Sequence, residues 1–189
     1  MLTAPLGLTS PRLLLRAPSA AIAMAATAGG TALARALDAR LPRCWPPAGT
    51  AAALAAQARL LRRAPEPCGW GLWYWLLPRD AGPGPRWTAI GVGGFHGPPG
   101  GDGEVELGYA LLPDYEGRGY ATEAVRLLAG WALAQPGVRR LVAHVERRGV
   151  ASLAVLRRAG FSAAGPAAAD RVRFERCRVV PALSGLRGR

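Results

Sequence analysis

Lysine and asparagine are absent from this sequence of 189 residues, and all 24 basic residues are arginine. With 12 acidic residues the formal net charge is +12, a value that usually points to a nucleic-acid partner. However, the arginines occur in scattered pairs and form no long run. Together with abundant Ala, Gly and Pro, this favours the compositional bias of a GC-rich genome and a solvated basic surface. Attraction to an anionic partner, such as RNA or an acidic peptide, is the alternative.

Cysteine and histidine are also scarce. The three cysteines, Cys44, Cys68 and Cys177, are far apart, and there are two histidines. Without a C-x-x-C pair or a histidine cluster, the sequence excludes a zinc site of the usual ligand spacing, and we expect no metal. An odd number of cysteines with no disulfide framework is typical of a reducing compartment, so we expect a cytoplasmic protein.

No hydrophobic run approaches the roughly 20 residues that span a bilayer, so no membrane contact is expected. The first 30 residues contain Arg12 and Arg16, an alanine-rich stretch at 20–28 and no acidic residue, a pattern similar to an export or transit peptide. The basic residues come after residue 10, however, and a leucine-rich segment lies between them. We therefore favour the first strand and first helix of the domain for this segment, with export as the alternative.

A chain of this length with 50% hydrophobic residues can bury a core of its own, so one folded domain is expected. Its predicted limits are residues 11–180. We interpret residues 1–10 as a flexible lead-in and residues 181–189 as a flexible basic tail, because chain ends are seldom tied down.

Hydrophobic periodicity and turn residues divide the domain into strand and helix patterns. Strands are predicted over residues 11–17, 69–77, 87–95, 105–111, 140–145, 161–163 and 172–180. Helices are predicted over residues 20–28, 31–41, 50–63 and 149–159, and another begins near Ala121 and is stopped by Pro136. In the strand at 69–77, alternation places Trp73 and Trp75 on one face and Tyr74 on the other.

The most informative segment joins a strand to a helix through a glycine turn. Residues from Val105 to Leu111 alternate as a strand does, and the helical pattern begins at Ala121. A second strand pattern follows this helix, so the two strands are expected to pair in parallel. Unpaired N–H groups and the helix dipole at the helix start favour a phosphate, and Gly117 and Gly119 allow its close approach.

The same segment resembles a known family. Residues 116–121, Glu-Gly-Arg-Gly-Tyr-Ala, resemble the Q/R-x-x-G-x-G/A signature of the GNAT superfamily of N-acetyltransferases, which binds acetyl-CoA. Residues 108–113 with 117–124, residues 152–161 and the opening strand at 11–16 are similar to the branch that contains ribosomal-protein N-terminal acetyltransferases. The resemblance implies an α/β fold with a mixed, mostly antiparallel sheet of six or seven strands. It also implies a central splayed parallel pair and helices on both faces.

The resemblance implies a reaction and a cosubstrate site as well. The expected reaction transfers an acetyl group from acetyl-CoA to a primary amine, with a protein N-terminal α-amine as the first choice of acceptor and small amines next. Contacts to acetyl-CoA are implied for backbone groups near Leu111 and Leu112 and for Glu116, Gly117, Arg118, Gly119, Tyr120 and Ala121. Pro113 has no N–H group to contribute. No acyl-enzyme is expected, because no cysteine or serine lies with a base.

Acetyl transfer needs a base, because an α-amino group titrates at about pH 8 and is largely protonated at neutral pH. Glu106, on the strand that enters the turn, is the predicted base, and Glu104 on the same face is the reserve. Ser152 is the predicted acid for the leaving thiolate. The alternatives are that both carboxylates are solvated and that the Ser152 hydroxyl bonds its own helix backbone. Trp45 either touches the acceptor or anchors its loop.

Three positions depart from the pattern of the family. Glu116 stands where Gln or Arg is usual, Gly149 where Asn is usual, and Leu156 where many members have the Tyr that protonates the thiolate. These departures support an alternative function, a degenerate acyl-CoA-binding sensor or scaffold without turnover. A ribosome- or RNA-associated protein is a third alternative, based on charge alone. A monomer and a homodimer are equally compatible with the sequence.

Overall fold

The computed structural model describes residues 6–63, 69–168 and 170–178. Cys68 and the predicted tail at 181–189 lie outside the described residues. The strands are β1 (Gly7–Thr9), β2 (Leu14–Arg16), β3 (Ala39–Arg40), β4 (Leu72–Pro78), β5 (Trp87–Phe95), β6 (Glu104–Leu111), β7 (Arg140–Glu146), β8 (Ser162–Ala168) and β9 (Arg171–Cys177). The helices are α1 (Ala20–Ala28), α2 (Gly30–Leu37), α3 (Ala51–Arg63), α4 (Tyr120–Ala134) and α5 (Val150–Arg158), with a short 3-10 helix, η1 (Pro113–Tyr115). None of these described helices has the length and apolar character needed to cross a bilayer.

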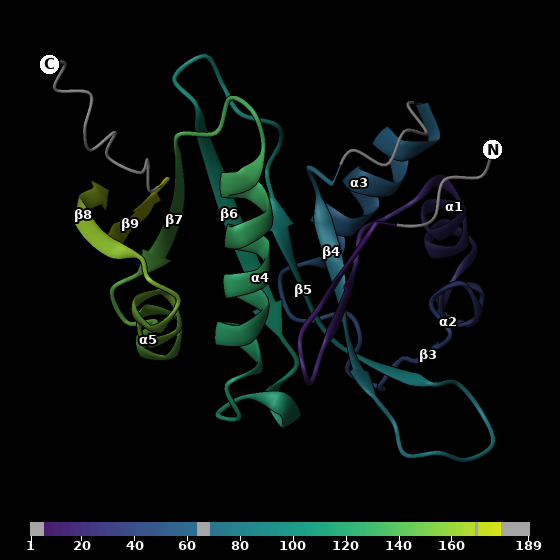
Figure 1. Cartoon of the computed structure of the whole chain (residues 1–189). Helices are drawn as coiled ribbons and strands as arrows, with labels where there is room; N and C mark the ends of the chain where they lie inside the picture. Colours follow the sequence, from purple (N-terminus) through teal and green to yellow (C-terminus); the bar gives the residue numbers. More distant parts are fainter. Residues whose placement is uncertain (1–5, 64–68, 169, 179–189) are drawn as a thin grey trace, which may run out of the picture.

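The strands form one mixed sheet in the order β1-β2-β4-β5-β6-β7-β9-β8. Neighbouring strands on this path are antiparallel except β6 and β7, which are parallel, and β3 makes a further short parallel pair with β5. Figure 1 shows α4 lying along β6, as a crossover between β6 and β7 requires. The prediction of a mostly antiparallel sheet with a central parallel pair is confirmed.

The sheet contains two short strands beyond the seven that periodicity predicts, namely β1 and β3. Since β1 lies within residues 1–10, the prediction of a loose lead-in is wrong for that strand. Leu6 and Leu8 pack against the main core, and β1 pairs with β2, which ties the segment down. Ala17 and Ile22 are also buried, so the segment that is similar to an export peptide is part of the domain.

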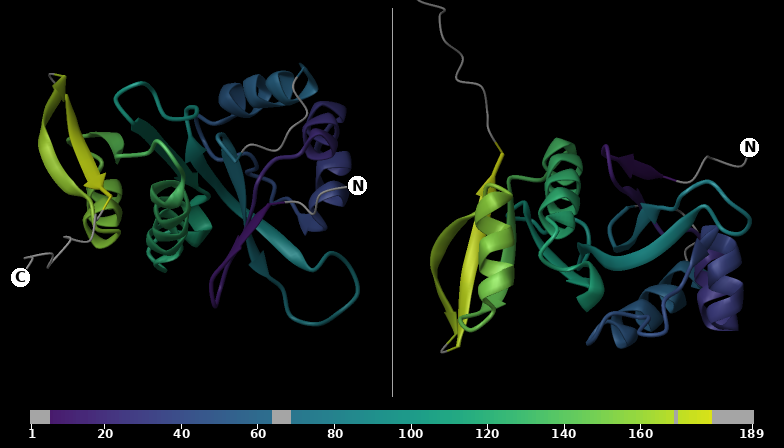
Figure 2. Two further views of the ribbon diagram at one scale, coloured as in Figure 1. Left: turned by 45° about the horizontal axis from the view of Figure 1, so that its top comes forward. Right: turned by 90° about the horizontal axis from the view of Figure 1, so that it is seen from below.

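Helices cover both faces of the sheet. α4 and α5 lie on one face, where Val125 and Leu128 of α4 pack in the same core as Trp73 and Trp75 of β4. α1 and α2 lie on the other face over Tyr74, and α3 packs against α1. Figure 2 shows α4 and the α1–α3 group on opposite sides of the strands. The alternation predicted for β4, with both tryptophans on one face and Tyr74 on the other, is confirmed.

The glycines of β5 let aromatic side chains close over the strand. A Cβ atom on Gly93 would lie 2.7 Å from Cβ of Tyr109 and against the ring of Trp75, and one on Gly91 would lie 2.7 Å from the carbonyl oxygen of Ala110. Because this space is left open, the Trp75 ring stacks on the Tyr109 ring with centroids 6.2 Å apart. The stacking fixes the Tyr109 side chain at the point where β6 leaves the core.

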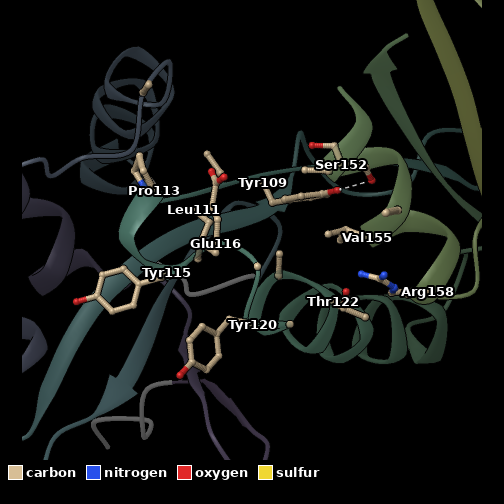
Figure 3. Close-up of a pocket in the computed structure, with 17 residues that line it drawn as sticks. Tyr109, Leu111, Pro113, Tyr115, Glu116, Tyr120, Thr122, Ser152, Val155 and Arg158 are labelled. Carbon is tan, nitrogen blue, oxygen red and sulfur yellow. Dashed lines mark hydrogen bonds between the residues drawn. The ribbon is translucent and has the colours of Figure 1, made fainter. Parts of the chain in front are cut away.

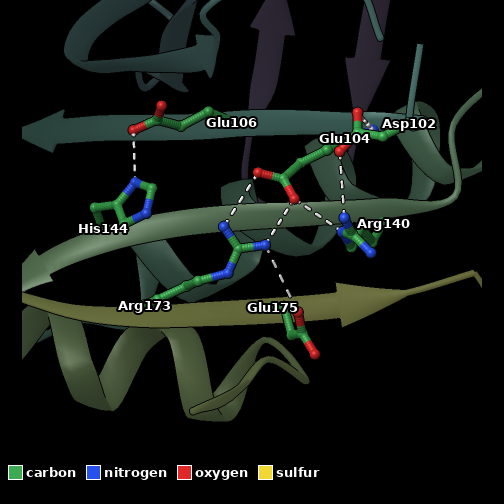
Figure 4. Close-up of polar contacts among 7 residues, drawn as sticks. All are labelled: Asp102, Glu104, Glu106, Arg140, His144, Arg173 and Glu175. Atoms are coloured by element: carbon green, nitrogen blue, oxygen red, sulfur yellow. Dashed lines mark hydrogen bonds and ion pairs between the residues drawn. The ribbon is translucent and has the colours of Figure 1, made fainter. Parts of the chain in front are cut away.

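Glu104 joins three strands on the face of the sheet opposite α4 (Figure 4). Its carboxylate accepts hydrogen bonds from Arg173 of β9 at 2.6 Å and from Arg140 of β7 at 2.8 Å. The hydrogen bond from Arg173, with that from Arg140, outweighs partial burial and lowers the pKa of Glu104 to about 2. Because both arginines occupy this carboxylate, the structure does not support the reserve role as a base.

We expect Glu104→Gln to lower the thermal midpoint at pH 7 by about 2–4 °C, the upper end for a partly exposed charge pair. Since the pKa of folded Glu104 lies near 2, below its usual value of 4.5, the stabilisation is complete above pH 4.5 and is lost as the pH falls through about 2. Melting curves of the two proteins should therefore converge toward pH 2. Glu175→Gln is the control, because Glu175 lies 3.8 Å from Arg173 and should shift the midpoint less. Equal midpoints for Glu104→Gln and wild type at pH 7 would contradict this expectation.

Candidate active site

β6 and β7 pair only at their beginnings. Their register runs from Glu104 opposite Arg140 to Glu106 opposite Val142, and no pairing follows beyond it. A cavity of about 450 Å³ opens there between the end of β6, the start of α4 and one side of α5 (Figure 3). We call it the first cavity. The splay predicted for the central parallel pair is thus confirmed, and it creates an opening next to the glycine turn.

The turn between β6 and α4 presents a row of backbone N–H groups to the first cavity. Gly117 and Gly119 have φ of +72° and +82°, in the left-handed region that favours glycine. The N–H of Glu123 makes the first helical bond, to the carbonyl of Gly119 at 3.1 Å. The N–H groups of residues 117–122 donate to no described residue. Since the positive end of the α4 dipole lies at the same place, this turn is suited to an anion.

The backbone of β6 offers further donors to the gap. The N–H of His96 donates to the carbonyl of Glu106, and the N–H of Leu112 donates to the carbonyl of Ile90, so even-numbered residues of β6 bond with β5. Because bonding direction alternates along a strand, the N–H groups of Tyr109 and the residue two positions on, Leu111, face the gap instead. Leu112 is fully buried and its N–H is occupied, so the structure does not bring it to the site.

Of the other residues predicted to contact acetyl-CoA, all but Arg118 line the first cavity. Those that line the first cavity are Leu111, Glu116, Gly117, Gly119, Tyr120 and Ala121. Arg118 does not line it, and its carbonyl accepts a hydrogen bond from Arg12 at 3.1 Å. The N–H of Glu116 donates to the carbonyl of Pro113, so it is not available to the cosubstrate, and the Glu116 side chain is exposed.

Arg12 braces the turn from the β1–β2 hairpin. Besides bonding the Arg118 carbonyl, its guanidinium donates to Glu123 at 2.8 Å and lies 4.8 Å from the centre of the Tyr120 ring. The Ser10 hydroxyl donates to the same Glu123 carboxylate. Burial raises the pKa of Glu123, but the hydrogen bonds from Ser10 and Arg12 lower it overall, which keeps the carboxylate charged. Local sequence patterns do not indicate this brace, because 111 positions separate Arg12 and Glu123 along the chain.

A second cavity, of about 520 Å³, adjoins the first and shares Tyr109 and Ser152 with it. Glu106, the predicted base, lines this second cavity together with His96 and His144. Burial raises the pKa of Glu106, but the hydrogen bond from His144 and the charge of His96 lower it overall. Sequence reasoning missed both histidines. The pairing of β5 with β6 brings His96 beside Glu106, and the pairing of β6 with β7 brings His144 within reach of the same carboxylate.

Ser152 and Tyr109 meet where the two cavities join (Figure 3). The Tyr109 hydroxyl donates to the Ser152 carbonyl at 3.1 Å, and the Ser152 hydroxyl bonds no described residue. Burial raises the pKa of Tyr109 to about 12, so the phenol stays protonated at neutral pH. Leu156, at the position where a Tyr is usual, is fully buried. Tyr109 thus provides a phenol at the site, and it reaches α5 from β6.

Trp45 takes the second of its two predicted roles. Its ring stacks on Tyr74 with centroids 6.2 Å apart, and it lines a separate apolar cavity among α1, α2 and α3. Ala48 and Gly49 of the same loop line the first and second cavities. Trp45 therefore anchors the loop, and its neighbours reach the site. Within the described part of the chain, no group of three His, Cys, Asp or Glu side chains could hold a metal ion.

Known proteins share both the sequence pattern and the fold. A family model described as "Acetyltransferase (GNAT) domain" matches residues 12–162. The curated relative "Uncharacterized N-acetyltransferase YjdG" from Bacillus subtilis (strain 168) is 34% identical over 61 residues. That match spans 32% of this chain and 36% of the relative's length.

Solved structures match over a longer part of the chain. A putative GnaT-family acetyltransferase from Bordetella pertussis is 25% identical with a TM-score of 0.59, over 91% of this chain and 99% of that one. The ribosomal-protein-S5-alanine acetyltransferase from Vibrio fischeri is 15% identical with a TM-score of 0.60, over 92% of this chain and 97% of that one, and so shares the fold. Because the family match covers most of the sequence, the chain belongs to the GNAT family of N-acetyltransferases, whose cosubstrate is acetyl-CoA.

Proposed function

We propose that this protein transfers the acetyl group of acetyl-CoA to a primary amine, with a protein N-terminal α-amine as the acceptor. The observation that carries the proposal is the row of N–H groups at residues 117–122, which donate to no described residue. All of these residues except Arg118 line the first cavity. A diphosphate supplies several acceptor oxygens and negative charge, both of which suit these donors at the start of α4.

The gap between β6 and β7 provides a path for the pantetheine arm. The N–H groups of Tyr109 and Leu111 face this gap, so amide and carbonyl groups of the arm can bond to the strand. A thioester that reaches the junction of the two cavities lies beside Tyr109 and Ser152. From there its carbonyl carbon is open to attack from the second cavity.

The second cavity is the proposed acceptor site. Glu106 and Glu146 both line it, and their carboxylates favour an ammonium group. The sequence resemblance to ribosomal-protein N-terminal acetyltransferases makes a protein N-terminus the first acceptor to test. The fold neighbour from Vibrio fischeri is named as a ribosomal-protein-S5-alanine acetyltransferase, which also favours testing a protein N-terminus before small amines.

The reaction needs two proton transfers. The acceptor ammonium loses one proton to the cluster of Glu106, His96 and His144, and the neutral nitrogen then attacks the thioester carbon to form a tetrahedral intermediate. The carbon–sulfur bond breaks as the carbonyl re-forms, and the second proton passes from nitrogen to sulfur through the Ser152 hydroxyl. Tyr109, with its raised pKa, donates a hydrogen bond but no proton. The products are the acetylated amine and free CoA.

Mass spectrometry tests this function directly. The protein is incubated with acetyl-CoA and a panel of peptides with free α-amines, lysine-containing peptides blocked at the N-terminus, and small amines. Because the chain contains no lysine, its own side chains add no ε-amine background. A mass increase of one acetyl group on the α-amine peptides, with equal release of free thiol, is the expected result. Binding of acetyl-CoA without thiol release from any amine would favour the sensor or scaffold instead.

Arg12→Ala should raise the dissociation constant for acetyl-CoA about tenfold, because the turn loses charge-assisted bonds to Glu123 and the Arg118 carbonyl. Isothermal titration measures the change. Arg35→Ala is the matched control, since it removes the same charge from an exposed position on α2. If both variants weaken binding equally, overall charge is responsible and the brace is not.

A further inference from the structure

Both histidines of the chain contact one carboxylate, that of Glu106. Nδ1 of His144 lies 3.0 Å from one carboxylate oxygen, and Nδ1 of His96 lies 3.3 Å from the other. Figure 4 shows the His144 contact across the two parallel strands. Since an ionised carboxylate can only accept, each Nδ1 is the donor. Glu106 therefore has an imidazole on each of its oxygens.

Because both oxygens of Glu106 accept an imidazole N–H, the lone pairs that are free to take a proton lie on the imidazole rings. An imidazole that donates from Nδ1 presents Nε2 as an acceptor when it is neutral. Neither Nε2 atom bonds a described residue, so both can receive a proton. Glu106, by contrast, would have to release an imidazole before it could meet an ammonium group. The carboxylate is better placed to orient the rings and to stabilise an imidazolium than to take the proton itself.

Of the two imidazoles, His96 is nearer to the path of the cosubstrate. A Cβ atom on Gly108 would lie 3.3 Å from Nε2 of His96, so this nitrogen lies over the splayed part of β6. Gly108 precedes Tyr109, which lines both cavities. The His96 side chain is 61% exposed, compared with 25% for His144. His96 is thus open to an incoming acceptor, whereas His144 is largely enclosed between β6 and β9.

We propose that Nε2 of His96 is the proton acceptor of the reaction, and that Glu106 and His144 are positioning residues. This proposal rests on the proposed acetyl transfer. The acceptor ammonium gives one proton to Nε2, which produces an imidazolium stabilised by the Glu106 carboxylate. The neutral amine attacks the thioester, and the imidazolium later returns its proton to solvent. The other charged groups that line this cavity are Glu146, the last residue of β7, and Arg171, the first residue of β9.

The pH dependence of His96→Gln separates a base from a structural role. With a peptide α-amine as acceptor, kcat/KM should fall about 100-fold at pH 7 while the affinity for acetyl-CoA is unchanged. The deficit should shrink to below about tenfold at pH 9, because the free amine then forms without a base. A structural defect would give the same loss at every pH. His144→Gln is the matched control and should lose less than about tenfold at pH 7.

Gly108→Ala provides a second variant that removes no hydrogen-bonding group of the cluster. Its new methyl group would crowd Nε2 of His96, and kcat/KM should fall about tenfold at pH 7. Wild-type activity in His96→Gln, or a larger loss in His144→Gln than in His96→Gln, would overturn the assignment of His96. If wild-type protein acetylates no amine, the proposed function fails first. If the wild-type protein acetylates an amine and His96→Gln is unaffected, the assignment of His96 fails and the proposed function stands.

Discussion

Gly119→Glu is expected to abolish detectable binding of acetyl-CoA, with a loss of at least about 100-fold in affinity. Gly119 has φ of +82° and is the N-cap of α4, so any side chain there strains the turn. A carboxylate at this position also places negative charge among the N–H groups that border the first cavity. Strain and repulsion act in the same direction, which is why we expect a large effect. Isothermal titration with acetyl-CoA measures it.

Gly130→Glu is the matched control for this experiment. Gly130 lies on the exposed side of the same helix, and a Cβ atom there meets no other atom within 4 Å. The control introduces the same residue and charge into α4 without touching the turn. We expect it to bind acetyl-CoA as wild type does. Undiminished binding by Gly119→Glu would end the assignment of this turn to the diphosphate.

Glu106→Gln should lower kcat by at least about 100-fold and leave acetyl-CoA binding unchanged. The amide that replaces the carboxylate has no negative charge to stabilise an imidazolium. Its NH₂ group would also oppose one of the two imidazole N–H donors, so His96 and His144 cannot both keep their contacts. Steady-state kinetics with the acceptor found by mass spectrometry, together with titration of acetyl-CoA, measures both quantities.

Glu104→Gln is the control for Glu106→Gln. Both carboxylates lie on the same strand and face, but two arginines hold Glu104 and two histidines hold Glu106. Below its melting temperature the Glu104 variant should turn over at the wild-type rate. Full activity in Glu106→Gln would remove this cluster from the mechanism, and equal losses in both variants would point to general damage of β6.

The features predicted correctly from sequence are those that depend on neighbours in the chain. Alternation fixed the two faces of β4, and the run from Val105 to Ala121 fixed the strand, turn and helix that make the first cavity. The prediction that the N–H of Leu112 faces the cosubstrate was wrong by one position. N–H groups along this strand point alternately to β5 and to the gap, and the sequence alone does not show which residues bond with β5. In a strand, one position changes the side on which an N–H group lies.

The contacts that sequence reasoning missed join residues far apart in the chain. The His144–Glu106 pair spans 38 positions, and the Arg12 contact with the Arg118 carbonyl spans 106. Neither residue type nor local pattern marks such partners, because a histidine on a strand or an arginine in a turn is common in solvated positions. The strands β1 and β3 escaped prediction for a related reason, since pairing with β2 and β5, and not their own short patterns, makes them strands.

β6 is paired with β5 on one side, but on the side of β7 it is unpaired beyond Glu106. Open edges in folded proteins invite pairing with foreign strands. Here β7 pairs with β6 through three residue pairs, at Glu104 to Glu106, so the open edge begins only beyond this closed end. A foreign strand that paired here would lie about 4.8 Å from β6, the spacing that β7 already occupies at the closed end. A competing chain can therefore pair only along Leu107 to Leu111, a shorter edge than the full length of β6.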